Sequence, residues 1–497
     1  MTSLAKQQRF LQDKKGSIFK EKGVMMKKIL LILTIITAAV CLFVYVQQVD
    51  TEHQETKIAA SKQSFFVAED GDDENDGSIE EPFQSLEKAS EQATPGTTVY
   101  IRGGTYYESI KVKHSGTKAN HIVFQAYDGE EVIISGEKIE DTEEETALVS
   151  IIDKSNITIK GLTFTNLSTD LADETVMGIY VTGNSSHITI EDNTVRNIET
   201  YHGDGNGHGI AVYATEAMKE IIIKGNLVEN LKLGASEALV LNGNIDGFNI
   251  SHNTVRNNDN IGIDMIGYEG TSKENDFVRN GTVESNIVYN NSSYGNPAYG
   301  EEYSAGGIYI DGGRNITVDQ NTVHHNDLGI EATSEHHKKY AINIDLTNNT
   351  VYENNYAGIS IGGYDTDRGG TKNSTISNNI LYKNDSKGLD GGQLMLQHDT
   401  SSNKIDKNIL TTSDKGLFIV NYFTANSNNT LSRNVYHQEE DKESSWIWKD
   451  EEYTTLSAFQ TATDSDSNSL YVDPKFVDAE NGDFTLKTDS PLKEIME

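Results

Sequence analysis

One short phrase recurs along the sequence and constrains the fold more than any other feature. Segments such as "ITIEDNTVRNI", "FNISHNTVRNN" and "ITVDQNTVHHN" are copies of it. The residue before the hydrophobic pair anchors each copy, and successive anchors are 26 to 35 residues apart. The anchors are Gly161, Asn193, Asn226, Asn253, Asn286, Asn321, Asn349, Asn379, Asn408 and Asn434. A repeat of this length indicates a solenoid or another array of similar units.

Each repeat alternates apolar and polar residues over short β-branched runs that Asn and Gly interrupt. No repeat contains a helix-length pattern, which excludes βαβ crossovers. A β-propeller fits poorly, because each blade needs about 40 residues and these repeats are shorter. One repeat cannot bury its own apolar face, but repeats stacked about 4.8 Å apart share a core and pair their backbones. The sequence therefore predicts an all-β fold, a right-handed parallel β-helix of about ten coils.

The anchoring asparagines fit this fold as structural residues. Asn bends a chain readily because its side chain bonds to nearby backbone groups. We expect the anchors to stack as an internal amide ladder that satisfies the backbone at each turn, with no catalytic role.

The two ends of the repeat array differ from its middle. We expect residues 64–145 to form an N-terminal cap and the first coils, including an amphipathic helix over 82–93 that covers open strand edges. Residues 146–440 should hold the β-helix and its loops, and residues 441–497 a C-terminal cap.

Residues 29–46, "ILLILTIITAAVCLFVYV", are uncharged and follow two lysines. A helix of this length spans about 27 Å, close to the thickness of a bilayer core. The segment is typical of a signal peptide or a membrane anchor, and it predicts an exported, extracellular or cell-surface protein. Residues 47–63 would be a spacer. Residues 1–28 would be a cytoplasmic leader, or would lie partly upstream of a true start at Met25 or Met26.

Cysteine and charge usage narrow the setting further. The only cysteine, Cys41, lies in the apolar segment, so the exported part forms no disulfides, as is usual in Gram-positive bacteria. The chain has 41 basic and 76 acidic residues, a formal charge of -35. Such a surface repels nucleic acid and anionic lipid, and it suits cation binding or solubility. We expect a monomer that meets a membrane only through residues 29–46.

A second strand follows each anchor and shares the frame Gly-Ile-x. Side chains alternate faces along a strand, so if Ile points into the core then x and x+2 point outward. This predicts a solvent-facing row that contains Asp264, Tyr309 and Glu331. The x column reads Ala211, Val240, Asp264, Tyr309, Glu331 and Ser360, and the x+2 column reads Tyr213, Asn242, Ile266, Asp311, Thr333 and Gly362.

Long loops flank this row and carry His, Tyr, Asp, Glu and Arg, at residues 201–208, 267–276, 291–304, 334–339 and 362–370. Long loops over one face of a solenoid commonly shape a binding groove. Aromatic, carboxylate and amide groups at a regular rise suit a polysaccharide, and Arg can pair with a uronate carboxylate bidentately. The predicted substrate-binding residues are His202, Asn242, Tyr268, Lys273, Glu335, His336, Tyr364 and Arg368.

The opening "FFVAEDGDDENDGSIEEPFQSLEKASEQATPGTTVYIRGGTYYESI" and the ending "DPKF" to "GDFTLKTDSP" resemble those of exported β-helix proteins of the pectate lyase superfamily. The resemblance is to polysaccharide lyase family nine and runs from about residue 64 to the C-terminus. It implies a Ca²⁺ ion held by aspartates and a lysine base. This sequence keeps Asp264 at one acidic position, has Asn260 and Ile261 at the acidic pair, and has Tyr309 or Ile310 at the lysine.

The first hypothesis is therefore a polyuronate lyase or C5-epimerase. Ca²⁺ bound by Glu237, Asp259 and Asp264 would neutralise the C6 carboxylate and acidify the C5 proton. Tyr309 would remove that proton, its pKa lowered from about 10 by the cation.

Two alternatives stay open on the sequence. An inverting glycoside hydrolase would use Asp264 with Glu331, whose backbones should lie roughly 9.6 Å apart, or Asp311 with Glu331 or Glu335. A non-catalytic surface protein would bind glycan without turning it over, which the missing lysine favours.

Overall fold

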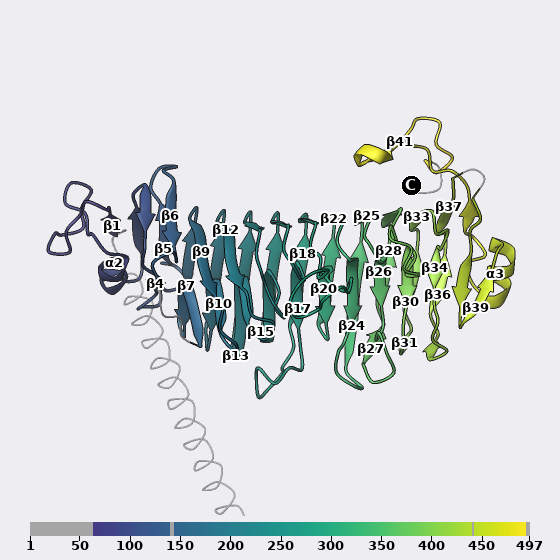
Figure 1. Cartoon of the computed structure of the whole chain (residues 1–497), viewed down its shortest axis with the longest axis horizontal. Coiled ribbons are helices and arrows are strands. Elements are labelled where there is room, and N and C mark those ends of the chain that lie inside the picture. Colours follow the sequence, from purple (N-terminus) through teal and green to yellow (C-terminus); the bar gives the residue numbers. More distant parts are fainter. Residues whose placement is uncertain (1–62, 140–143, 440–441, 494–497) are drawn as a thin grey trace, which may run out of the picture. The chain divides into compact units, whose positions relative to one another are not determined.

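The computed structural model describes residues 63–139, 144–439 and 442–493, and residues 64 to 437 within these ranges form a parallel β-helix (Figure 1). The predicted signal or anchor segment at 29–46, its leader and most of the spacer lie outside the described residues. Among the described residues, no helix is long and apolar enough to cross a membrane.

A 13-stranded parallel sheet forms one wall of the solenoid. The ten anchors stand immediately before or one residue away from its strands β9 to β37, so each sequence repeat supplies one turn. Two more turns, at β3 and β6, precede the anchored ones. The strands are β3 (Gly104–Tyr106), β6 (Val132–Ser135), β9 (Thr163–Thr169), β12 (Thr194–Thr200), β14 (Leu227–Glu229), β16 (Thr254–Arg256), β19 (Ile287–Tyr289), β22 (Thr322–His324), β25 (Thr350–Tyr352), β29 (Ile380–Tyr382), β33 (Ile409–Thr411), β37 (Val435–His437) and β40 (Leu470–Tyr471).

A 25-stranded sheet forms the remaining walls, as two ladders joined by the long strands β13 (Asn206–Lys224) and β15 (Leu239–Ser251). The ladder that carries the Gly-Ile-x frame is called the site ladder below. Its other strands are β4 (Ile110–Lys111), β7 (Glu145–Ile152), β10 (Thr175–Thr182), β17 (Ile263–Ile266), β20 (Gly306–Asp311), β23 (Leu328–Thr333), β26 (Ala357–Ile361), β30 (Leu394–Leu396) and β34 (Ile419–Val420).

The second ladder completes each turn between the site ladder and the 13-stranded sheet. Its strands are β1 (Gln63–Val67), β2 (Thr97–Ile101), β5 (Ile122–Ala126), β8 (Ile157–Lys160), β11 (Ile188–Glu191), β18 (Arg279–Glu284), β21 (Arg314–Asp319), β24 (Tyr340–Thr347), β28 (Thr375–Ser377), β32 (Lys404–Asp406) and β36 (Thr430–Ser432), with β27 (Gly370–Lys372), β31 (Thr400–Ser401) and β35 (Asn426–Ser427) beside them.

The core is one continuous stack of apolar side chains along the inside of the solenoid. Ile190, Ile223, Ile250, Val283 and Val318 occupy matching positions in successive turns and are fully buried. Burying a Val or Ile side chain fully contributes about 1.5–3 kcal/mol, so the stack is the main source of stability.

The predicted asparagine ladder is present. From Asn193 to Asn434, the side-chain amide of each anchor donates to the Oδ1 of the next, at 2.9–3.1 Å. Each of these asparagines also donates to a backbone carbonyl of the preceding turn, as Asn286 does to Ile250. A second amide ladder, which we did not predict, stacks Asn258, Asn291, Asn326, Asn354, Asn384 and Gln393.

The ends carry the remaining elements. Helix α2 (Leu86–Gln92) lies within the predicted range 82–93, packs against β1 and β4, and buries Leu86 and Ala89 in the core. After β37, the hairpin β38 (Trp446–Trp448) to β39 (Glu451–Tyr453) contacts helix α3 (Leu456–Thr463). A second hairpin, β41 (Phe476–Asp478) to β42 (Asp483–Leu486), is joined by the short 3-10 helix Ala479–Asn481.

Candidate functional site

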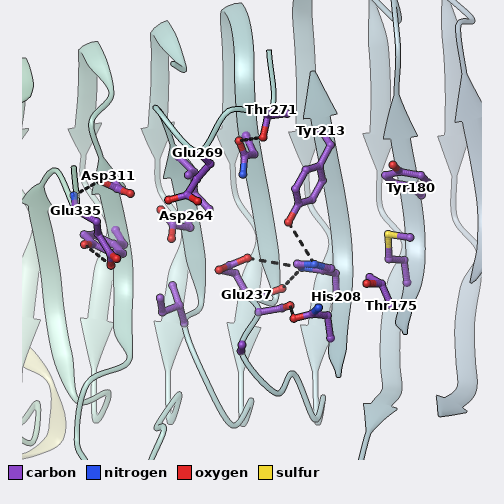
Figure 2. Close-up of a pocket in the computed structure, with 18 of the residues that line it drawn as sticks. Thr175, Tyr180, His208, Tyr213, Glu237, Asp264, Glu269, Thr271, Asp311 and Glu335 are labelled. Atoms are coloured by element: carbon purple, nitrogen blue, oxygen red, sulfur yellow. Dashed lines mark hydrogen bonds and ion pairs between the residues drawn. The ribbon is translucent and has the colours of Figure 1, made fainter. Parts of the chain in front are cut away.

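A pocket of about 540 Å³ opens on the site ladder. Its floor comes from the successive strands β10, β13, β15, β17 and β20, and its rim from the loops between them (Figure 2). Six carboxyl groups line it, and no Lys or Arg does. The lining residues are Glu145, Thr175, Met177, Tyr180, Asn206, His208, Tyr213, Ala235, Ser236, Glu237, Asn242, Ile261, Asp264, Ile266, Glu269, Thr271, Tyr299, Tyr309, Asp311 and Glu335.

The predicted x column is confirmed residue by residue. Asp264 pairs with Val240 on one side and with Tyr309 on the other, Tyr309 pairs with Glu331, and Glu331 pairs with Ser360. The shared Gly-Ile frame sets this register, since the isoleucines stack in the core and turn the next side chain outward. The column therefore runs straight across five turns on the outside of the barrel.

The expectation that this row faces solvent is wrong. Asp264 is 2% exposed, Tyr309 5% and Glu331 7%. Loops fold over the column, so that Asp264 and Tyr309 form the floor of a recess. Glu331 is not among the lining residues, because it sits under its neighbours, and its Oε1 accepts hydrogen bonds from Ser360 and Gln397.

Three carboxyl groups of the pocket, those of Asp264, Asp311 and Glu237, have a raised pKa. Burial and the nearby Glu237 and Asp311 raise the pKa of Asp264 well above its ordinary value. Burial and Glu335 do the same for Asp311. Burial raises the pKa of Glu237 to about 8. At neutral pH the pocket is therefore lined by several protonated carboxyl groups, which can donate protons or exchange them for a cation.

His208 has the opposite shift and a defined tautomer. Burial lowers its pKa to about 4, so the imidazole is neutral at physiological pH. Its Nδ1 lies 3.0 Å from the carbonyl oxygen of Glu237, which can only accept, so Nδ1 carries the proton. Nε2 is then a free acceptor, and the hydroxyl of Tyr213 lies 3.4 Å from it.

The contact of His208 Nδ1 with the Glu237 side chain, at 3.7 Å, joins two groups that are both neutral near pH 7. Protonation of His208 would favour ionisation of Glu237, because the resulting opposite charges attract at this distance. Tyr213, His208 and Glu237 thus form a linked set at one end of the pocket, and Asp311 and Glu335 lie at the other (Figure 2). Asp264 and Glu269 lie between them.

Three side chains could hold a cation between them. Glu269, Asp311 and His336 each offer a ligand atom, and these atoms lie within 4.8 Å of one another. One buried oxygen of Asp264, in the same pocket, has no hydrogen-bond partner. Carboxylate oxygens are the ligands that Ca²⁺ prefers. An unpartnered buried oxygen in a pocket without Lys or Arg fits a positive ion, and the carboxyl oxygens of Glu269, Asp311 and Asp264 suit the expected Ca²⁺. The imidazole of His336 is not a ligand that Ca²⁺ prefers.

The structure separates the three residues predicted to bind Ca²⁺. Glu237 and Asp264 both line the pocket, and each contributes to its acidity. Asp259 does not line it, because its Oδ1 accepts a 2.6 Å hydrogen bond from the backbone of Leu233. Burial raises the pKa of Asp259 to about 6, and the hydrogen bond opposes this shift. Its place is in the turn beneath the pocket rim.

The predicted substrate-binding residues divide into two groups, and the first lies at the pocket. Asn242 accepts a hydrogen bond from Thr271, and Glu335 accepts one from the hydroxyl of Tyr309 at 3.2 Å. His336 belongs to the cation-capable group and bonds to Glu269.

The second group lies outside the pocket lining. Tyr268 accepts hydrogen bonds from Arg314 and packs on His336. Tyr364 and Arg368 pair with each other. His202 and Lys273 are on loops, and their side chains do not line the pocket. His202 lies near Asp204, and Lys273 is exposed.

Sequence reasoning missed His208, Tyr213 and Glu269 as site residues. His208 ends the 201–208 loop and directly precedes a Gly-Ile frame. Tyr213 stands in the x+2 column beside Asn242. Both could therefore have been selected from the sequence as outward-facing neighbours of Asn242. Glu269 had no such signal. It reaches Asp311 only because the loop after β17 folds back over the barrel.

Comparison with known families agrees with this architecture. Residues 65–262 match a family model described as a Pel9A-like right-handed β-helix region, and residues 306–445 match a model of a right-handed β-helix region. A solved structure of the mannuronan C-5 epimerase AlgE6 A-module from Azotobacter vinelandii is 14% identical, with a TM-score of 0.50, over 76% of this chain and 89% of that one. The fold is thus a right-handed parallel β-helix of the pectate lyase superfamily.

Two curated relatives refine the assignment. The pectate lyase PEL9 of Emericella nidulans is 46% identical over 79 residues, which are 16% of this chain and 19% of that protein. The uncharacterized protein YwoF of Bacillus subtilis is 54% identical over 468 residues, 94% of this chain and 99% of that protein. The chain belongs to the same family as YwoF.

Proposed function

We propose that the protein acts on a uronate-containing polysaccharide by removing the C5 proton of a uronate, which leads to β-elimination or to epimerisation at C5. The observation that carries this proposal is a neutral His208 with its free Nε2 facing the hydroxyl of Tyr213 in an acid-lined pocket. The local similarity to a pectate lyase supports the substrate class.

Tyr213 and His208 act together as the general base. The Tyr213 oxygen takes the C5 proton while its own proton passes to Nε2 of His208. The Nδ1–H bond to the Glu237 carbonyl holds the ring in place, and that carbonyl oxygen, as the acceptor of the Nδ1–H, stabilises the imidazolium. Burial and nearby carboxyl groups raise the pKa of both Tyr309 and Tyr213 well above 10. Tyr213 has an imidazole acceptor for its proton, Nε2 of His208 at 3.4 Å, whereas the hydroxyl of Tyr309 donates to Glu335, so the proposal assigns proton removal to Tyr213 and hydrogen bonding to Tyr309.

Glu269 and Asp311, with Asp264 in the same pocket, are the residues that would hold Ca²⁺ in this proposal. When bound, the ion supplies neutralisation of the C6 carboxylate and so makes the C5 proton more acidic. The protein's own contribution is to exclude water from this end of the pocket and to keep Asp311 fixed, through the 2.7 Å bond that its Oδ1 accepts from the Glu335 amide.

After proton removal the bond from C4 to the bridging oxygen breaks, C4 and C5 become doubly bonded, and the leaving oxygen needs a proton. The imidazolium of His208 can return it through Tyr213. Return of a proton to the opposite side of C5 gives the epimer instead, and a protonated carboxyl group such as Asp264 is present for that step.

A second candidate, glycoside hydrolysis, is favoured by one observation. Asp311 and Glu335 both line the pocket, and the raised pKa of Asp311 suits a general acid. The pair Asp264 and Glu331 fits less well, because Glu331 lies outside the lining.

The test is an assay of the full-length protein on polygalacturonate, polymannuronate and a neutral glucan, with Ca²⁺ and with chelator. Absorbance of unsaturated uronates on the uronate polymers, lost in His208→Gln and Tyr213→Phe, is the expected result. New reducing ends without that absorbance would replace the proposal by hydrolysis. No product, with binding intact, would leave a glycan-binding protein.

A further inference from the structure

A second hollow, of about 440 Å³, lies on the 13-stranded sheet, at strands β3, β6, β9 and β12. Its lining is unlike that of the acidic pocket. Hydroxyl and amide side chains predominate, with one arginine, Arg196, and one acid, Glu137. This surface is called the Arg196 groove below.

The sequence builds a row of amides along this groove. Asn166, Asn197 and Asn230 follow matching positions of neighbouring strands and have positive φ values of 59°, 52° and 55°. Asn accepts this left-handed conformation more readily than most residues, so the repeat places it at each of these turns. Successive amides are then presented at the strand spacing of about 4.8 Å.

Arg196 is a free cation in this groove. It lies in register between Thr165 and Glu229, but Glu229 is bonded by Arg256 at 2.7–2.8 Å. Among the described residues, Arg196 has neither an ion pair nor a hydrogen bond, although the chain carries a formal charge of -35. The amide of Asn197 makes only long, 3.4 Å hydrogen bonds, to Thr165 and Asn166. An unpaired guanidinium beside such amides can bind a carboxylate with two parallel hydrogen bonds.

A second cation lies at the same hollow. The ammonium group of Lys138 is 3.5 Å from the ring centroid of Tyr107, and Tyr107 lines the groove and is 39% exposed. The positive charges of Arg196 and Lys138 therefore favour an anion at this groove, whereas no Lys or Arg lines the acidic pocket.

We propose that the Arg196 groove is a second, non-catalytic binding site for an acidic glycan, with Arg196 on a sugar carboxylate and the asparagine amides on hydroxyl groups. The identity of the glycan, a polyuronate, rests on the proposed function, but the groove's preference for a sugar acid does not. A polymer held here stays near the protein, which raises its effective concentration at the acidic pocket without any new contact there.

The experiment is calorimetric titration of the full-length protein, in a His208→Gln background that prevents turnover, with hexagalacturonate. Neutral cellohexaose and inorganic phosphate are the comparison probes. We expect Arg196→Gln to weaken one hexagalacturonate binding event about tenfold, the effect of losing one charge-assisted contact at a half-exposed site. Asn197→Gly, which keeps the left-handed backbone and removes the amide, should weaken the same event less.

Lys118→Gln is the matched control, because it removes one positive charge from an exposed turn outside the groove and should leave binding unchanged. Equal affinity in the His208→Gln protein with and without Arg196→Gln, or no binding of hexagalacturonate, would overturn the proposal. So would full displacement by phosphate, which would show an anion site without sugar recognition, or an equal loss of cellohexaose binding. Absence of turnover in the wild type would count against the proposed function alone.

Discussion

Two buried polar arrays run along the same solenoid and are built on opposite principles. In the asparagine ladder, each side-chain amide from Asn193 to Asn408 donates one N–H to the Oδ1 of the next anchor. Each also donates to a backbone carbonyl. In the acidic pocket, carboxyl groups gather, the pKa values of Asp264 and Asp311 are raised, and an oxygen of Asp264 has no hydrogen-bond partner.

The comparison shows how one repeat yields both stability and chemistry. Neutral amides satisfy each other in a low-dielectric interior at little electrostatic cost. Carboxyl groups in the same spacing repel, so they persist only where a ligand, a proton or a cation relieves the repulsion. The ladder should therefore respond to mutation through stability, and the pocket through activity and ion binding.

The largest effect should come from the pocket. His208→Gln removes the acceptor for the Tyr213 proton, and loss of a general base typically lowers turnover 10²- to 10⁴-fold. Initial rates on the preferred polyuronate would show this, with unfolding temperature as the control for folding. A loss of less than threefold would contradict the role given to His208.

The next effect should appear in the ladder. Asn286→Ala removes the acceptor of the Asn253 backbone N–H and of one Asn253 side-chain N–H, and it removes a donor to the Ile250 carbonyl. Each buried orphan costs about 1–3 kcal/mol, so unfolding in urea should reveal a loss of about 3–5 kcal/mol.

The matched control for that variant is Asn343→Gly. Asn343 is an exposed asparagine with φ 57°, stacked on Asn315, and glycine keeps its backbone conformation. A change under about 0.5 kcal/mol is expected there. Equal losses at the two sites would show that burial of the ladder does not matter.

A smaller effect should follow cation binding. At a Ca²⁺ concentration about 100 times its dissociation constant, binding to the folded state adds about 2.7 kcal/mol to the free energy of unfolding. Asp311→Asn should abolish that increase, and chelator should reverse it in the wild type. An unfolding curve that Ca²⁺ leaves unchanged would contradict Ca²⁺ binding at this pocket.

The smallest effect, counted per pH unit, concerns Glu331. Burial raises its pKa from 4.5 to about 8 in the folded protein. Between these values the folded state holds a proton that the unfolded state has released, so stability falls by about 1.4 kcal/mol per pH unit as pH rises. Glu331→Gln should flatten this slope in urea titrations at several pH values, whereas the exposed Glu216→Gln should not. An unchanged slope in Glu331→Gln would refute the shift.

Periodicity made the fold and the register accessible from sequence. The spacing of the anchors predicted the coils, and the Gly-Ile frame placed Asp264 next to Tyr309 and Tyr309 next to Glu331. The second amide ladder was equally predictable from the sequence, because an asparagine stands five residues after most anchors, as Asn291 follows Asn286. The two early turns were harder to count, since they lack the anchoring asparagine.

Loop paths were not accessible, and they decide the site. Nothing in the local sequence indicates that Glu269 returns over the barrel to Asp311 while Asp259 turns to the Leu233 backbone. The burial of the row and the pKa shifts follow from those loops. Strand neighbours were therefore predictable from the repeat, and the partners that loops bring were not.

The most direct measurement follows the C5 hydrogen itself. Polyuronate incubated with the protein in D₂O and examined by NMR should show deuterium at C5 or an unsaturated terminal residue, and neither should form with His208→Gln. Chain cleavage that leaves every C5 hydrogen in place and yields only saturated ends would contradict proton removal by the Tyr213–His208 pair.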